Sequence, residues 1–214
     1  MKKLLSIFLF HIVFISILCG QQSANPENKV KKSLFRPFLV AGINASQVDG
    51  DDIAGYTKLG FNGGIGTYIM LPKNFSLGFE LLYSQKGAIT TKNTRSPQFD
   101  FFKLNIDYLD VPIMISYHDK ERAIFSLGVI VNNLVRTKEE RGFNVALYPN
   151  FIYKQVTVEG LASVSFHFSK KVGMNLRFAY SLNDIGKEKY ALSNLKDASQ
   201  RNNYFTARIF YLIK

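Results

Sequence analysis

The sequence contains no tryptophan, only three histidines and a single cysteine, Cys19. A lone cysteine cannot form an intramolecular disulfide or complete a cysteine-based metal site. The chain also lacks an apolar run of the roughly 20 residues that a membrane-spanning helix requires. Its longest apolar stretch runs only from Leu4 to Leu18. These absences exclude a disulfide-rich scaffold, cysteine-based metal sites and a protein that crosses a membrane with several helices.

The N-terminus has the composition of a secretory signal peptide. Two lysines precede the apolar stretch and a polar segment follows it, which is the order of parts in such a signal. We expect cleavage after Gly20, because Leu18 stands where a lipoprotein signal would have a small residue before its cysteine. An uncleaved N-terminal anchor is the alternative. Cleavage removes Cys19 and divides this part of the chain into a signal peptide, 1–20, and a flexible polar leader, 21–34.

Acidic residues are few relative to basic ones. The chain has 27 Lys and Arg against 16 Asp and Glu, which gives a formal net charge of +11. Such a balance can indicate nucleic acid binding, but an exported chain meets anionic lipid or glycolipid surfaces instead. We therefore expect outer-membrane lipid and glycolipid as partners and no nucleic acid. The alternative is that these charges lie on solvated loops and have no partner.

A two-residue period is clearest from Phe75 to Lys86. One face carries Phe75, Leu77, Phe79, Leu81 and Tyr83, and the other carries Ser76, Gly78, Glu80, Ser84 and Lys86. Side chains alternate between the two sides of a strand, so this segment predicts a strand with one apolar and one polar face. The apolar face would point into the core of a soluble sandwich, or outward to lipid in a membrane barrel.

Seven further segments alternate in the same way: 35–46, 60–71, 104–117, 123–134, 156–168, 173–183 and 202–213. In one of them the apolar residues change sides between Tyr108 and Leu109, and Pro112 cannot donate a backbone hydrogen bond. We therefore expect a β-bulge between Tyr108 and Pro112.

The connections between these segments alternate in length. Long connections begin near Val48, Gly87, Arg136 and Ile185, and short charged turns separate the other segments. This alternation is typical of up-and-down outer-membrane barrels, and strands of about ten residues suit a tilted crossing of a bilayer. The sequence therefore predicts an all-β fold, an antiparallel transmembrane barrel of about eight strands over residues 35–214. A soluble barrel of lipocalin type, with the faces reversed, is the alternative.

Four stretches resemble the small outer-membrane β-barrel proteins of Bacteroidota known as the PorT-type family: 55–64, 79–87, 108–112 and 177–185. Together the resemblance covers essentially all of the mature chain. It implies an outer-membrane barrel, whereas only the namesake of the family is tied to protein secretion. The chain departs from such barrels at its end, because Lys214 stands where an aromatic residue is often found.

Five ionisable side chains fall on the polar faces of the predicted strands: Glu80, Glu159, His167, Arg177 and Arg208. If the apolar faces contact lipid, these five point into the barrel. An eight-stranded barrel is just wide enough for side chains to fill it, and buried charges must be paired. We expect a structural network in which two acids face two arginines, forming a plug rather than lining a pore.

Catalytic and metal-binding patterns are weak. His167 shares a face with Ser163 and Ser165, which would suit a lipid-modifying enzyme, but no third group that would orient the histidine is evident, and His118 falls in a predicted turn. The acidic segment 49–52 lacks the later ligands of a calcium loop. We predict no catalytic residue, no cofactor and no metal.

The sequence thus favours a monomeric, non-enzymatic outer-membrane barrel that acts through its long external loops on a protein partner or on glycolipid. A component of a protein-secretion apparatus and a lipid-modifying outer-membrane enzyme are the alternatives.

Overall fold

The computed structural model describes residues 34–49, 55–90, 102–119, 122–141, 153–186 and 200–213. The predicted signal peptide and nearly all of the predicted leader lie outside these ranges. The described residues form eight strands: β1 (Phe35–Asp49), β2 (Lys58–Met70), β3 (Phe75–Thr90), β4 (Phe102–Asp119), β5 (Ala123–Arg141), β6 (Val156–His167), β7 (Val172–Ser181) and β8 (Arg201–Leu212). Within the same ranges, no helix is long and apolar enough to cross a membrane.

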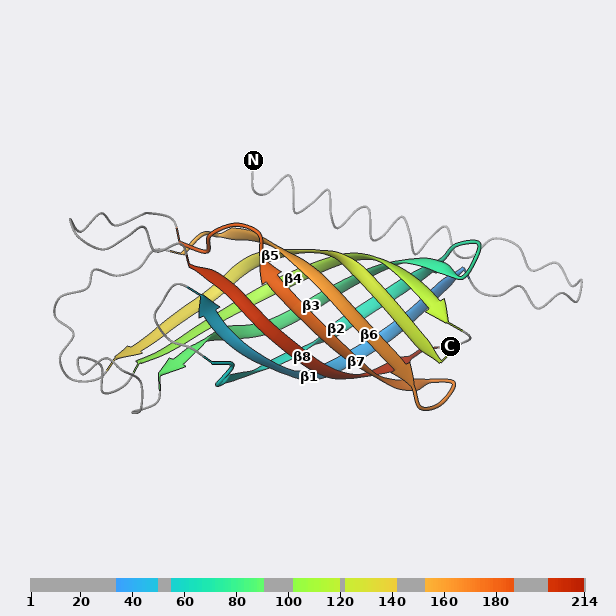
Figure 1. Cartoon of the computed structure of the whole chain (residues 1–214), viewed down its shortest axis with the longest axis horizontal. Coiled ribbons are helices and arrows are strands. Elements are labelled where there is room, and N and C mark those ends of the chain that lie inside the picture. The colour runs from blue at the N-terminus through green and yellow to red at the C-terminus, as the bar shows by residue number, and fades with distance from the viewer. Residues whose placement is uncertain are drawn as a thin grey trace, which may run out of the picture. The chain divides into compact units, whose positions relative to one another are not determined.

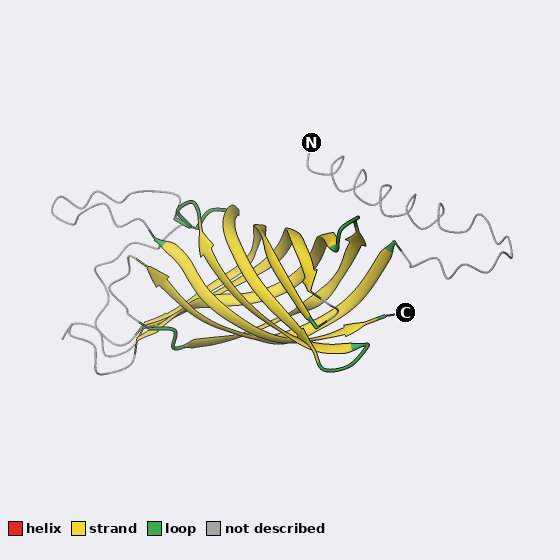
Figure 2. Cartoon of the chain, turned by 45° about the vertical axis from the view of Figure 1, so that its right-hand side comes forward, coloured by secondary structure: helices red, strands yellow, loops and turns green. Residues whose placement is uncertain are grey.

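The strands close into an antiparallel barrel in which each pairs with its neighbours in the sequence (Figures 1 and 2). Closure is made by β1 and β8, whose residues pair from Phe38 opposite Leu212 to Asp49 opposite Arg201. Since hydrocarbon offers no hydrogen-bond partner, only a sheet without free edges can span a bilayer. The predicted eight-stranded up-and-down order is confirmed.

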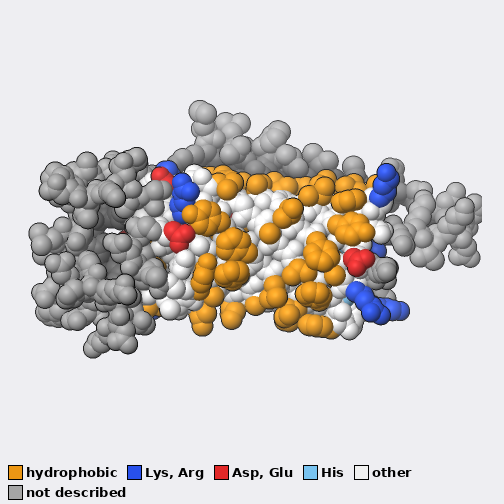
Figure 3. Space-filling model, in the orientation of Figure 1, with side chains coloured by type: hydrophobic (Ala, Val, Ile, Leu, Met, Phe, Trp, Pro, Cys, Tyr) orange, Lys and Arg blue, Asp and Glu red, His pale blue; other side chains and the backbone are white. Residues whose placement is uncertain are grey.

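Apolar side chains cover the outside of the barrel and polar side chains fill the inside. In β3, Phe79 and Leu81 are 37% and 45% exposed, whereas Glu80 and Lys86 are 5% and 0% exposed. Figure 3 shows the apolar band on one face of the molecule, between two ends that carry charged residues. This polarity is that of a membrane barrel. The lipocalin-type alternative, which would place the aromatic side chains inside, is wrong.

Outward-facing aromatic residues gather at both edges of this band. We call the barrel end with the short turns the short-turn rim and the opposite end the long-loop rim. The belt at the short-turn rim contains Phe35, Phe75, Tyr117, Phe125, Phe166, Phe168 and Tyr211, and the belt at the long-loop rim contains Tyr56, Phe61, Tyr83, Phe178, Tyr180 and Phe205. Aromatic belts mark the two interfaces of a bilayer. Along β3 the two belts lie at Phe75 and Tyr83, a span of nine residues, and a tilted crossing needs about 9–11.

The predicted bulge lies in a different strand. Leu104, Ile106 and Tyr108 are buried and Leu109 is exposed, so the alternation in β4 continues unbroken. The register shift occurs where Asp107 pairs with Arg136 and Tyr108 with Leu134, which leaves Val135 of β5 as the extra residue. The apolar residues of β4 change sides because the interior near the long-loop rim is itself apolar.

Two of the long connections begin later than the sequence suggested. The chain continues as strand past Gly87 to Thr90 and past Arg136 to Arg141, because β3, β4 and β5 go on pairing with one another. Glycine at position 87 adopts a φ of +136°, and a Cβ there would meet the carbonyl oxygen of Leu104. The glycine that suggested a loop therefore permits close contact between β3 and β4.

Candidate functional site: the barrel interior and its rims

The interior side chains form successive layers along the barrel axis, and β3 contributes to each. From the short-turn rim, Ser76 lies among aromatic and aliphatic side chains, Glu80 belongs to an arginine layer, Lys86 belongs to a lysine layer and Ala88 belongs to an apolar layer. Residues on alternate positions of one strand share a face, so one strand can supply all four.

The arginine layer places one carboxylate between two guanidinium groups. Glu80 Oε1 accepts a hydrogen bond from Arg177 Nη2 at 2.9 Å, and Glu80 Oε2 accepts one from Arg208 Nη1 at 3.0 Å. Arg208 also donates to Asn175 Oδ1, through Nη2 at 2.7 Å and Nε at 3.1 Å. Its Nη1 lies 3.3 Å from Asn62 Oδ1. These contacts offset the desolvation of three buried charges.

The lysine layer is built around one ammonium group. Lys86 Nζ lies 2.8 Å from Glu159 Oε2, 3.1 Å from Asp110 Oδ2 and 3.1 Å from Asn132 Oδ1. The side chains of Lys86, Asp110 and Glu159 are at most 1% exposed. An ammonium has three protons to donate, and here each has an oxygen acceptor.

Two tyrosines complete the lysine layer. Lys86 Nζ lies 4.5 Å from the ring centroid of Tyr204 and 4.9 Å from that of Tyr108, which is the range of cation–π contacts. The Tyr204 hydroxyl donates a hydrogen bond to Glu159 Oε2 at 2.7 Å. Asn202 Nδ2 lies 3.4 Å from both Glu159 Oε1 and the Tyr108 hydroxyl. The ammonium is therefore enclosed by oxygens and aromatic faces.

The two charged layers have opposite formal charges. One carboxylate and two arginines leave the arginine layer with an excess of one positive charge, while one lysine and two carboxylates leave the lysine layer with an excess of one negative charge. The sum over both layers is zero. Together the two layers are therefore formally electroneutral.

The structure places the five residues singled out from the sequence in three different surroundings. Glu80, Arg177 and Arg208 meet in the arginine layer, whereas Glu159 pairs with Lys86 and not with an arginine. His167 lies elsewhere, with its ring edge-on to Phe210 at 5.1 Å between centroids. Lys86 and Asp110 were missed as members of a network, although both fall on the polar faces of their strands.

A serine and a histidine do meet in the interior, but not the pair considered from the sequence. Ser165 accepts a hydrogen bond from Asn175. It is Ser76 Oγ that lies 2.7 Å from a histidine nitrogen, Nε2 of His118, in β4 rather than in a turn. Ser76 is fully buried, and a catalytic nucleophile needs access to its substrate. In the described ranges no group of three His, Cys, Asp or Glu is placed to hold a metal.

The long-loop end of the interior is closed by apolar packing. The described ends of two connections meet here: Tyr153 forms a β-bridge with Gly186, and the amide of Lys154 donates a hydrogen bond to the Ile185 carbonyl at 2.7 Å. Ile185 is completely buried. The apolar layer consists of Val48, Ala88, Leu104, Ile106, Tyr108, Tyr153 and Ile185. It closes the barrel above the lysine layer.

On the outside of the long-loop rim, basic side chains are paired with acidic ones. The pairs are Arg136–Asp107 at 2.7 Å, Lys138–Glu140 at 2.8 Å and Arg201–Asp184 at 3.6 Å. Beyond the aromatic belt, the hydrogen bond from Lys138 lowers the pKa of the Glu140 carboxyl. Three of the basic side chains in the described part of this rim are therefore held in local ion pairs.

Comparison with known protein families identifies the family to which this barrel belongs. Residues 22–187 match the model of the family described as the outer membrane protein beta-barrel domain. This match spans well over half of the chain, so the protein belongs to that family and is located in the cell outer membrane. The match names the broad outer-membrane family and not the PorT-type family.

Several solved structures are similar in outline. Neisserial surface protein A is 14% identical over 84% of this chain and 97% of its own, with a TM-score of 0.44. Ail, the attachment invasion locus protein of Yersinia pestis, is 10% identical over 85% of this chain and 100% of its own, with a TM-score of 0.46. The outer membrane protein AlkL is 14% identical over 91% of this chain and 97% of its own, with a TM-score of 0.39. These likenesses are too distant to assign a ligand. No curated protein matches the sequence.

Proposed function

We propose that this protein is a monomeric, non-enzymatic outer-membrane barrel whose interior is a structural plug and whose activity resides in its long external connections. The observation that carries the proposal is the filled interior. Both charged layers are buried, and an apolar layer closes the long-loop end above them. A barrel of eight strands has room for such packing and for little else.

The test of the plug is solute permeation. The purified barrel, reconstituted in liposomes, is expected to give no swelling with small sugars and no discrete conductance steps in a planar bilayer. A reconstituted porin serves as the positive control. Stepwise conductance from the wild-type barrel would contradict the plug.

Contact through the long connections is testable by site-specific cross-linking. The mature chain expected after cleavage at Gly20 has no cysteine, so one introduced cysteine gives one labelling site. We propose Asn93→Cys in the connection from β3 to β4, with Asp119→Cys at the short-turn rim as the matched control. Adducts with a protein or glycolipid are expected from position 93 and not from position 119. Adducts from position 119 alone would contradict a role for the long connections.

A second candidate function rests on the resemblance of four stretches of the chain to the PorT-type family. Under this proposal the barrel is a component of a protein-secretion apparatus, and its partner is another protein of that apparatus. The same cross-linking experiment distinguishes the two. A cross-linked secretion component, together with lost export of cargo in a deletion strain, supports the second candidate. Normal export of cargo in that strain would contradict the second candidate function.

A further inference from the structure

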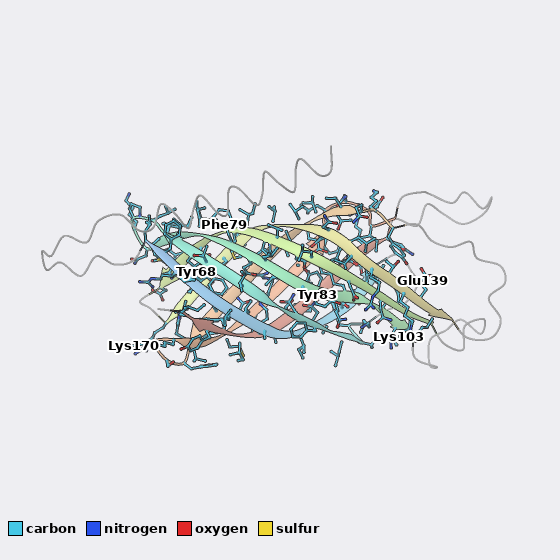
Figure 4. The ribbon with its side chains drawn as sticks, turned by 180° about the vertical axis from the view of Figure 1, so that it is seen from behind. Tyr68, Phe79, Tyr83, Lys103, Glu139 and Lys170 are labelled. Carbon is cyan, nitrogen blue, oxygen red and sulfur yellow. The ribbon has the colours of Figure 1, made fainter. Side chains whose placement is uncertain are left out.

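The short-turn rim carries a ring of basic side chains that contribute to none of the interior layers. Lys73 lies in the turn between β2 and β3, Arg122 precedes β5, and Lys170 and Lys171 lie in the turn between β6 and β7. We call these four residues the basic collar. Figure 4 shows Lys170 at the end of the barrel opposite Lys103 and Glu139. Every described short turn contributes, so the positive charge surrounds the rim.

Among the residues that the structure describes, no carboxylate forms an ion pair with a collar side chain, whereas three cations of the opposite rim, Arg136, Lys138 and Arg201, are paired. Lys73, Arg122 and Lys170 are exposed, and Lys171 is half-buried. Asp119 is the acidic residue in the described part of this rim. In Figure 3, Lys and Arg predominate at the right-hand end of the molecule, which is the short-turn end. The exposed positive charge there can attract an anion from outside the protein.

The collar lies directly beside the aromatic belt. Lys73 comes two residues before Phe75, and Lys170 comes two residues after Phe168. Lys171 Nζ lies 5.9 Å from the ring centroid of Tyr211. Aromatic belts sit at the level of the lipid headgroups, and long basic side chains near that level extend their charged ends into the headgroup region.

We propose that the basic collar binds the phosphate groups of anionic phospholipids in the leaflet that surrounds the short-turn rim. In bacterial outer-membrane barrels the short turns face the periplasm, which makes this the periplasmic leaflet. The distribution favours lipid over an acidic protein, because separate turns place the cations around the circumference next to the belt. A protein partner would instead require a contiguous patch on one side.

The test compares two variants with equal loss of charge. Lys73→Gln/Arg122→Gln/Lys170→Gln neutralises three collar positions, and Lys103→Gln/Lys138→Gln/Arg201→Gln neutralises three cations near the long-loop rim. Native mass spectrometry of each barrel in neutral detergent measures the bound fraction of phosphatidylglycerol and, separately, of phosphatidylcholine. We expect the wild-type barrel to prefer phosphatidylglycerol. The collar variant should lose this preference by roughly fivefold for each cation removed at low salt, and the long-loop variant should retain it.

A charge-retaining variant controls for a loss of lipid binding that is caused by misfolding. Lys73→Arg/Arg122→Lys/Lys170→Arg should bind phosphatidylglycerol as the wild type does, and each variant should show the heat-dependent gel shift of a folded barrel. Equal binding of the two lipids by the wild type would overturn the proposal, and so would equal losses in the two neutralised variants. A collar variant that keeps phosphatidylglycerol but loses an acidic periplasmic protein would assign the collar to a protein partner. Because the lipid measurement does not involve the long connections, its outcome is independent of the function proposed above.

Discussion

Glu80 and Arg208 form a two-point ion pair across the barrel interior, with Arg208 Nη1 3.0 Å from Glu80 Oε2 and Arg208 Nη2 3.3 Å from Glu80 Oε1. Their strands, β3 and β8, are not hydrogen-bonded neighbours in the sheet. The pair therefore fixes the distance between two walls of the barrel, which backbone hydrogen bonding between adjacent strands cannot do directly.

Replacing Glu80 with leucine should strongly destabilise the barrel. The substitution leaves Arg177 and Arg208 buried without their carboxylate, and removal of one partner of a buried pair costs about 3–5 kcal/mol. The midpoint of the heat-dependent gel shift measures the loss, with the outward-facing Thr67→Val as the matched control. Equal midpoints for wild type and Glu80→Leu would show that the pair does not stabilise the fold.

Replacing Lys86 with methionine should destabilise the barrel at neutral pH, because Asp110 and Glu159 then lose the cation between them. The deficit relative to wild type should shrink as the pH falls, since protonation of Asp110 removes part of the buried negative charge. Urea unfolding of both proteins at several pH values checks whether their difference in stability decreases as the pH falls. The double variant Lys86→Met/Glu159→Gln should be more stable than Lys86→Met alone, and strict additivity would contradict the coupling.

Replacing Gly87 with alanine should weaken the pairing of β3 with β4 near the long-loop rim. The residue has a φ of +136°, and its new Cβ would meet the Leu104 carbonyl oxygen. Strain of this kind costs on the order of 1–3 kcal/mol. Gly160→Ala is the control, because a Cβ there meets only a Leu182 methyl group at 3.6 Å. Protease cleavage near Thr90 should accelerate in the first variant and not in the second.

The expressed protein should fractionate with the outer membrane and run differently on gels before and after heating. A closed barrel resists detergent until heat opens it, because every strand is hydrogen-bonded on both sides. A soluble periplasmic protein with a single gel mobility would contradict the membrane assignment of the outer face.

Alternation along single strands predicted the strands and their two faces, and the alternation of long and short connections predicted the barrel, the order of its strands and which face points outward. In β3 the two patterns together assigned Phe79 to the outside and Glu80 to the inside, as the structure shows. The period of two follows from the geometry of one strand and needs no knowledge of its neighbours. The bulge at Val135 of β5 was not predicted. The buried apolar residues of β4 near the long-loop rim give the same sequence pattern as a change of register in β4.

Pairing inside the barrel could not be predicted in the same way. Alternation places a side chain on a face, but its partner depends on the stagger of strands across the barrel. Glu80 and Arg177 are 97 residues apart in the sequence, and Lys86 and Glu159 are 73 apart. Ser76 and His118 meet because β4 continues to Asp119, whereas the charged residues at its end suggested a turn.

The opposite excess charges of the arginine and lysine layers limit how the interior of this protein can vary between relatives. Loss of Arg177 alone would leave the two layers together negative by one charge, and loss of Asp110 alone would leave them positive by one charge. Simultaneous loss of both would preserve neutrality, although β7 and β4 are not adjacent in the barrel. Substitutions at these positions should therefore occur in compensating pairs, which related sequences would reveal as correlated changes between distant strands.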